Sequence, residues 1–167
     1  GRSLVLASSS PRRRELLTGA GLSFVVRPAN IDETPLGGET PTAYVRRLSI
    51  EKAAASAASP LSSAAEVVIA ADTTVALGRR LFAKPAHREE AVAMLKALSG
   101  QRHQVLTGMA LLRDGRAHCF HETSEVEFME LDEARIDAYL ERVHVLDKAG
   151  AYAIQEEADL IIRGFSG

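Results

Sequence analysis

A serine loop followed by arginines is the part of this sequence best suited to bind an anion. Residues 4–7 (LVLA) predict a short buried strand, and residues 8–10 are all serine. Ser10 before Pro11 is typical of a helix N-cap followed by the first helical residue. Residues 12–14 are all arginine and would occupy the first helical turn, where the free N–H groups and the helix dipole favour negative charge. The pattern favours a bound phosphate, although a solvated basic turn would explain it equally well.

Two carboxylates and a lysine are further candidates for chemistry on a phosphate. Asp72 follows the apolar run 67–71, and α/β sheets bind ligands at the carboxyl ends of their strands. A carboxylate there can hold a divalent cation or orient a water molecule, but it can equally cap the next turn. Glu33 lies in an acidic loop, and Lys84 precedes Pro85 after a predicted hairpin. For both residues, simple exposure to solvent is the alternative interpretation.

Small residues dominate the segment 147–155, so another backbone or a ligand can approach it closely. Gln155 at its end can donate and accept hydrogen bonds at the edge of a nucleotide base, and a tightly packed junction is the alternative. The histidines show no metal-ligand spacing, and the sequence contains neither a Gly-x-Ser-x-Gly elbow nor a Walker A motif. We therefore expect no histidine metal site and no serine-nucleophile triad.

The composition predicts one globular domain with a substantial core. The chain has 167 residues, of which 46% are hydrophobic and 25% are charged, and its net charge is −2. This charge balance and the lack of tryptophan give no reason to expect nucleic acid or a membrane as a partner. A single cysteine, Cys119, excludes an intramolecular disulfide and a cysteine-based zinc site. The sequence shows no apolar span or signal peptide, so a cytoplasmic location is expected.

Helical and strand patterns alternate along the chain. Helices are predicted at residues 11–20, 41–55, 88–98 and 136–143. Strands are predicted at residues 4–7, 24–26, 66–72, 105–112, 117–128 and 160–162, with a small hairpin at 75–82. The alternation, together with the Asp114-Gly115 hairpin signal, predicts an α/β protein with a mixed sheet and helices on both of its faces.

Taken together, these motifs resemble one family, the Maf nucleoside triphosphate pyrophosphatases. The matching segments are spread over nearly the whole chain: LASSSPRR (6–13), DETP (32–35), YVRRL (44–48), EKA (51–53), ADT (71–73), KP (84–85), MLKALSG (94–100), HQVLTG (103–108) and DKAGAY (147–152). The resemblance implies a single domain over residues 1–167, with an elongated α/β/α fold, a central mixed sheet and a cleft between two lobes. It also implies hydrolysis of a nucleoside triphosphate to the monophosphate and pyrophosphate, dependence on Mg²⁺ or Mn²⁺, and a homodimer.

The resemblance further implies roles for individual residues. Asp72 matches the catalytic acid of the family, which accepts a proton from the attacking water, and Glu33 matches a second carboxylate near the metal. Both are therefore assigned to catalysis and to metal binding, and Lys84 matches a catalytic lysine that contacts phosphate. The residues assigned to substrate binding are Ser8, Arg12, Arg13, Lys52, Thr73 and Gln155. Among these, Arg12, Thr73 and Gln155 match positions tied to substrate choice.

The sequence is similar to the family branch that acts on dTTP and UTP, with CTP or modified pyrimidine nucleotides as further expected substrates. The branch that acts on 7-methyl-GTP carries Trp and Gln where this chain has Arg12 and Thr73. Two usual glycines of the family are Ala153 and Glu156 here, which implies altered affinity or selectivity. The usual final segment of the family has no counterpart after Gly167, so a shortened or incomplete C-terminal segment is expected.

Two other functions compete with the pyrophosphatase hypothesis. The first is a regulatory nucleotide-binding protein linked to inhibition of septum formation, which would bind nucleotide without turnover. The second is a hydrolase of a related fold that acts on purine analogues such as ITP. The chain keeps the acidic and basic residues that an enzyme needs, so hydrolysis of pyrimidine triphosphates is the leading hypothesis.

Overall fold

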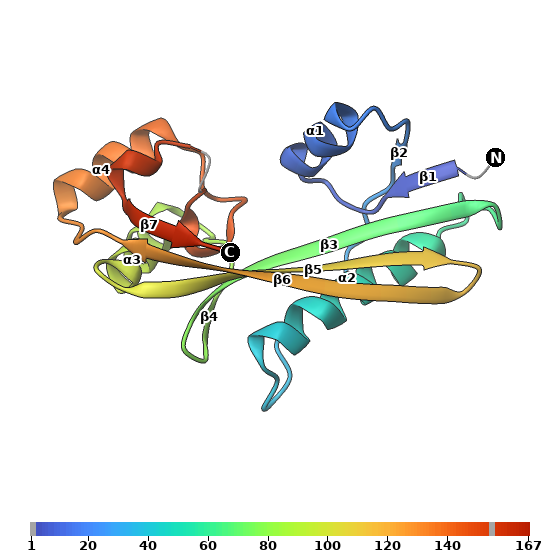
Figure 1. Ribbon diagram of the computed structural model, residues 1–167, viewed down its shortest axis with the longest axis horizontal. Helices are drawn as coiled ribbons and strands as arrows, with labels where there is room; N and C mark the ends of the chain where they lie inside the picture. The colour runs from blue at the N-terminus through green and yellow to red at the C-terminus, as the bar shows by residue number, and fades with distance from the viewer. Residues whose placement is uncertain (1–2, 154–155) are drawn as a thin grey trace. The chain divides into compact units, whose positions relative to one another are not determined.

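The computed structural model describes residues 3–153 and 156–167 (Figure 1). The described helices are α1 (Pro11–Gly19), α2 (Pro41–Ala57), α3 (Arg88–Leu98) and α4 (Glu133–Arg142), with two short 3₁₀ helices, η1 (Ala149–Ala151) and η2 (Ala158–Leu160). The described strands are β1 (Ser3–Leu6), β2 (Val25–Val26), β3 (Glu66–Leu77), β4 (Arg80–Phe82), β5 (Arg102–Arg113), β6 (Arg116–Phe128) and β7 (Ile162–Ser166). None of the described helices combines the length and the apolar character that crossing a membrane requires.

The strands form a mixed sheet. Their order is β2-β1-β3-β5-β6-β7, and β4 pairs with β3 outside this path. β1 is parallel to both β2 and β3, whereas the β3–β4 and β6–β7 pairs are antiparallel. The predicted mixed sheet of an α/β fold is therefore confirmed.

The chain divides into two compact units. Unit 1 comprises Gly1–Asp72 and Thr107–His121, and unit 2 comprises Thr73–Leu106 and Glu122–Gly167. The long strands β3, β5 and β6 each contribute residues to both units. Each unit is described separately below.

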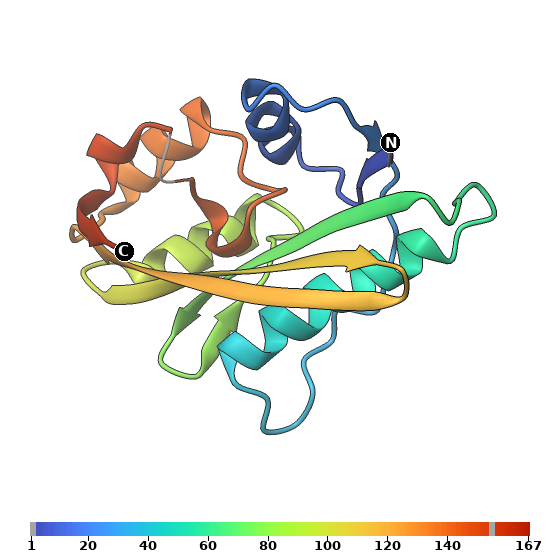
Figure 2. The same ribbon diagram turned by 45° about the vertical axis from the view of Figure 1, so that its right-hand side comes forward.

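In unit 1, α1 and α2 lie on opposite sides of the sheet (Figures 1 and 2). A small apolar core joins the strands to α2, and it consists of Val5, Ala7, Ala53, Val68, Ala70 and Ala110. A Cβ atom at Gly108 in β5 would lie 2.3 Å from the carbonyl oxygen of Val45 in α2. Glycine is needed at this position because α2 packs directly against the β5 backbone.

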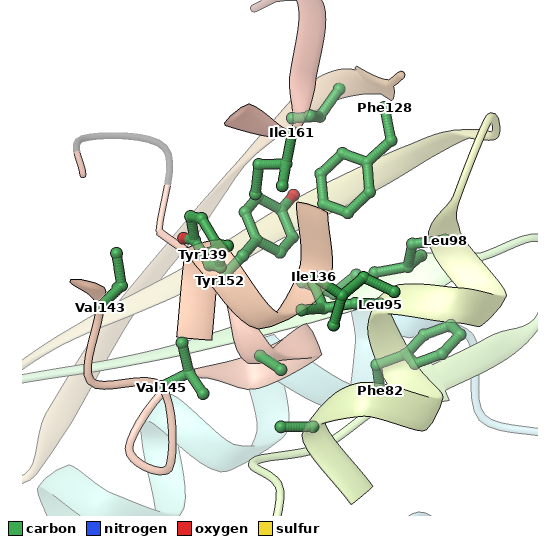
Figure 3. Packing of buried hydrophobic residues seen from close by; sticks show 14 residues of the cluster. Phe82, Leu95, Leu98, Phe128, Ile136, Tyr139, Val143, Val145, Tyr152 and Ile161 are labelled. Atoms are coloured by element: carbon green, nitrogen blue, oxygen red, sulfur yellow. The ribbon is translucent and has the colours of Figure 1, made fainter. Parts of the chain in front are cut away.

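Unit 2 holds the larger apolar core, which Figure 3 shows from close by. The predicted helix at 88–98 is confirmed as α3, and its residues Ala91, Leu95 and Leu98 are fully buried, as their spacing predicted. α4 buries Ile136 and Tyr139 against the same core. The core is completed by large side chains of the strands and of the segment after α4, among them Phe82, Phe128, Tyr152 and Ile161.

Several strand boundaries differ from the prediction, among them the end of β3 and the start of the last strand. β3 does not end at Asp72 but continues to Leu77, because the β-branched residues that follow the aspartate keep an extended chain that then pairs with β4. Asp72 thus lies within a strand rather than at its carboxyl end. The last strand begins at Ile162 instead of Leu160, since residues 158–160 form η2 and only the chain beyond them pairs with β6.

Candidate active site

Asp72 is a buried carboxylate held by a lysine of α2. The side chain of Asp72 is 9% exposed, and its Oδ1 atom accepts a hydrogen bond of 2.6 Å from Nζ of Lys52. Burial raises the pKa of Asp72 above the usual range of a carboxyl group, whereas the charge and the hydrogen bond of Lys52 lower it. The net direction is upward, so Asp72 combines a charged partner with increased basicity.

Glu33 is the second carboxylate that Lys52 contacts. Nζ of Lys52 lies 3.1 Å from Oε1 of Glu33, and the Glu33 side chain is 47% exposed. The negative charge of Glu33 raises the pKa of Asp72 further, although less than burial does. The structure thus places one cation between the two carboxylates that the sequence indicated, and this cation is itself a predicted substrate-binding residue.

The loop between β1 and α1 has the capped geometry that the sequence predicted. The Ser10 side chain accepts a hydrogen bond of 3.4 Å from the backbone N–H of Arg13, which makes Ser10 the N-cap of α1. Ser8 is buried, and its Oγ atom accepts hydrogen bonds from the Ser10 backbone N–H at 3.1 Å and from Nη1 of Arg13 at 3.4 Å. These bonds fix the loop that leads into the helix N-terminus.

Arg13 connects this loop electrostatically with Asp72. Burial lowers the pKa of Arg13, and the Asp72 carboxylate opposes that effect. Arg12, by contrast, is 57% exposed and makes a long contact of 3.9 Å with Glu15. The first turn of α1 contains no acidic residue. Unit 1 therefore combines cations at a helix N-terminus with a buried base, an arrangement suited to a phosphate and an attacking water.

A comparison with models of known protein families shows which family this chain belongs to. The model of the Maf-like protein family matches residues 3–167. The chain belongs to the Maf family. The segments that suggested this family from the sequence thus belong to a match over almost the entire chain.

Maf-family relatives from several bacteria are similar over nearly all of this chain. A dTTP/UTP pyrophosphatase of Pelotomaculum thermopropionicum is 46% identical over 99% of this chain and 86% of its own length. A dTTP/UTP pyrophosphatase of Anaeromyxobacter dehalogenans is 47% identical over 98% of this chain and 83% of its own length. The structure of the Staphylococcus aureus Ham1 protein has a TM-score of 0.57 at 15% identity, and it covers 94% of this chain and 90% of that one. This last similarity supports the fold alone.

Two carboxylates of the site, Asp72 and Glu33, are the side chains that could contribute ligands to a metal ion. Among the described residues, no group of three or more His, Cys, Asp or Glu side chains could hold a metal ion. Asp72 and Glu33 do share Lys52 as a partner, which places two carboxylates in one site. Mg²⁺ in such sites is commonly bound by one or two carboxylates together with water and phosphate oxygens.

Two further predicted site residues, Thr73 and Lys84, lie in unit 2. Thr73 directly follows Asp72 in β3 and is partly buried. Lys84 follows β4 and is exposed, while Gln155 lies outside the described residues. The roles of these three residues in the site stay predictions.

The structure also shows contacts around Glu33 that the sequence analysis missed. The Tyr44 hydroxyl donates a hydrogen bond of 2.6 Å to the backbone carbonyl of Glu33. Nη2 of Arg47 donates one of 3.2 Å to the carbonyl of Thr34. Tyr44, Arg47 and Lys52 are all residues of α2. The three-residue step from Tyr44 to Arg47 is a sequence signal that these two side chains lie on a common helix face.

Proposed function

We propose that this Maf-family enzyme hydrolyses dTTP and UTP between the α- and β-phosphates, releasing the nucleoside monophosphate and pyrophosphate. The observation that carries the proposal is the buried Asp72 carboxylate, which is held by Lys52 and interacts electrostatically with Arg13 of the serine–arginine loop. The substrate preference rests on the relatives named dTTP/UTP pyrophosphatase, which share 46–47% of their residues with this chain. CTP and modified pyrimidine triphosphates complete the proposed range.

In the proposed mechanism, Asp72 is the general base. Its carboxylate accepts a proton from a water molecule while the water oxygen forms a bond to phosphorus and the bridging P–O bond breaks. Pyrophosphate leaves with the electron pair of that bond. The raised pKa of Asp72 suits this role, because a more basic carboxylate accepts the proton more readily.

The cations of the site neutralise the triphosphate and the charge that develops during hydrolysis. We assign Ser8, Arg12 and Arg13 to the phosphates, since they lie in the capped loop and the first turn of α1. Lys52 joins them from α2, and Lys84 is proposed as a further phosphate contact. Held by Asp72 and Glu33, a Mg²⁺ or Mn²⁺ ion would supply additional charge neutralisation on phosphate oxygens.

Substrate choice is assigned to Arg12, Thr73 and Gln155. This assignment, like the expected homodimer, rests on the resemblance of these segments to the Maf family. Exchanging Thr73 for glutamine, the residue of the 7-methyl-GTP branch, would test it through the ratio of kcat/KM values for UTP and 7-methyl-GTP.

The decisive experiment measures pyrophosphate release from dTTP, UTP, CTP, 7-methyl-GTP, GTP and ITP with Mg²⁺ or Mn²⁺. Wild-type protein is compared with Asp72→Asn and with Glu66→Gln, a control carboxylate of the same strand that pairs with Arg27 at 2.6 Å. We expect release from dTTP and UTP that falls by orders of magnitude in Asp72→Asn and persists in Glu66→Gln.

Other outcomes would redirect the assignment. Equal turnover by wild type and Asp72→Asn would refute the role of the aspartate. Nucleotide binding without turnover at saturating metal would favour the regulatory protein linked to septum formation. Preferential release from ITP or GTP would favour a purine house-cleaning enzyme.

A further inference from the structure

We propose that Tyr44 and Arg47 are positioning residues, which hold the loop backbone at Glu33 and influence hydrolysis through that carboxylate. This inference rests on the proposed function. It concerns the segment between β2 and α2, which carries Glu33 and contains no helix or strand of its own. Such a segment needs contacts from elsewhere to keep a carboxylate in place.

Tyr44 holds the loop at Glu33 itself. Its hydroxyl lies 2.6 Å from the Glu33 carbonyl oxygen, and its side chain is buried in the first turns of α2. Because the Tyr44 side chain is largely shielded from water, water competes little for this hydrogen bond.

Arg47 holds the loop on the other side of Glu33. It donates to both oxygens of the Glu39 carboxylate, at 2.6 and 2.9 Å, and to the carbonyl oxygen of Thr34 at 3.2 Å. Its remaining nitrogen contacts Glu51 at 2.9 Å within α2. Glu39 in turn accepts a hydrogen bond of 3.1 Å from the backbone N–H of Leu36. One planar guanidinium thus fastens two parts of the loop to the helix.

These contacts matter because the Glu33 side chain has little else to hold it. Its ion pair with Lys52 spans 3.1 Å, and the Glu33 side chain is 47% exposed, so water weakens this contact as a restraint on the loop. The backbone at residues 33 and 34, by contrast, accepts hydrogen bonds from the buried Tyr44 and from Arg47, whose side chain is 21% exposed. The position of the carboxylate near Lys52 therefore follows from where Tyr44 and Arg47 place the backbone.

A double-mutant cycle tests whether both residues act through Glu33. Tyr44→Phe deletes one hydroxyl. Arg47→Lys keeps the positive charge but loses the planar guanidinium, which donates hydrogen bonds to Glu39 and Thr34 at the same time. We expect each change to lower kcat roughly five- to tenfold, with KM for dTTP changing less. In a Glu33→Gln background, the same changes should alter kcat by less than about twofold, because the group they position is gone.

Arg27→Lys is the matched control. Arg27 also donates two hydrogen bonds to one carboxylate, that of Glu66, at 2.9 and 2.6 Å. Both residues lie in unit 1, as Arg47 does. We expect Arg27→Lys to lower stability towards urea and to change kcat by the same factor with and without Glu33→Gln. If Arg47→Lys and Tyr44→Phe behave in this additive way, their role is structural and the proposal is overturned.

Amide hydrogen exchange separates failure of this inference from failure of the proposed function. The Leu36 amide is bonded to Glu39, and the Thr34 amide is bonded to Asp32 at 2.9 Å. We expect faster exchange of these amides in Tyr44→Phe and Arg47→Lys, but wild-type exchange there in Arg27→Lys. Unchanged exchange would refute the positioning role even in a chain without turnover, whereas a wild type that releases no pyrophosphate would refute the proposed function alone.

Discussion

Replacing Lys52 with methionine tests whether one cation holds the two carboxylates of the site. The Lys52 side chain is 15% exposed and its partner Asp72 is 9% exposed, so the pair is largely shielded from water. Methionine fills most of the lysine volume without carrying charge. The change therefore removes the counterion and leaves the packing of α2 nearly intact.

The loss of stability follows from this burial. Removing one partner of a buried ion pair typically costs about 3–5 kcal/mol, because the other charge stays behind unpaired. The positive charge of Arg13 also stabilises the Asp72 carboxylate and compensates part of the loss, so we place the loss near the lower limit, at about 3 kcal/mol. For a chain of this length, that corresponds to a melting temperature lower by roughly 6–12 °C.

Urea unfolding of Lys52→Met, Asp72→Asn and the double variant measures the pair directly. We expect the double variant to be about 2 kcal/mol more stable than Lys52→Met alone, since it no longer buries an unpaired carboxylate. The control is Lys96→Met, whose ion pair with Glu133 spans 3.4 Å with the lysine 52% exposed and should contribute less than about 1 kcal/mol. If Lys52→Met loses no more stability than Lys96→Met, the reasoning is wrong.

The same pair makes the stability deficit of Lys52→Met depend on pH. Lys52 lowers the pKa of Asp72, so its removal raises that pKa further. Below the raised pKa the carboxyl group of the variant is neutral and needs no counterion. We therefore expect the deficit to be small in acid and to grow as the pH rises through the pKa of Asp72.

Four further predictions follow from the geometry. Glu33→Gln should move the acid limb of the kcat/KM profile to lower pH, because the Glu33 charge raises the pKa of Asp72, and a shift to higher pH would contradict this. Gly150→Ala should lower the free energy of unfolding by about 2 kcal/mol, because Gly150 has a φ of +71° and an added Cβ would lie 2.9 Å from Cγ2 of Val75. In urea titrations, adding Val75→Ala should restore part of the lost stability. Arg12→Ala should raise KM for dTTP while leaving the melting temperature unchanged, as its side chain is 57% exposed. Chelation with EDTA should abolish pyrophosphate release and added Mg²⁺ or Mn²⁺ should restore it, whereas full activity in EDTA would refute the proposed metal.

Local signals were sufficient for most elements of the fold. The N-cap at Ser10 and the apolar spacing within α3 each depend on residues within a few positions, and both are confirmed. The end of β3 was predicted wrongly because Asp72 suggested a boundary that the pairing of Val75 with Phe82 overrides. The hairpin over residues 75–82 was itself predicted, but its first strand was taken as separate from the strand that contains Asp72, whereas the structure joins the two as β3.

The sequence analysis named the residues of the candidate site but not the contacts between them. Asp72, Glu33 and Lys52 were all singled out from the sequence, yet nothing in their spacing indicated that the lysine contacts both carboxylates. The contacts of Tyr44 and Arg47 with the Glu33 loop were missed for the same reason. They depend on the course of a loop without regular structure, which long-range contacts determine.

Burial of Asp72 and Arg13 has opposite effects on stability and on the proposed chemistry. Desolvation raises the pKa of Asp72 and lowers that of Arg13. Each of these charges would therefore destabilise the folded chain if it stood alone. Apolar residues of similar volume would commonly be neutral or stabilising in such places, so stability alone does not explain the charges. A general base, however, must be basic enough to accept a proton and still ionised before the reaction. Burial supplies the first property to Asp72, and the cations Lys52 and Arg13 supply the second, which is why we place the reaction at this carboxylate rather than at the half-exposed Glu33.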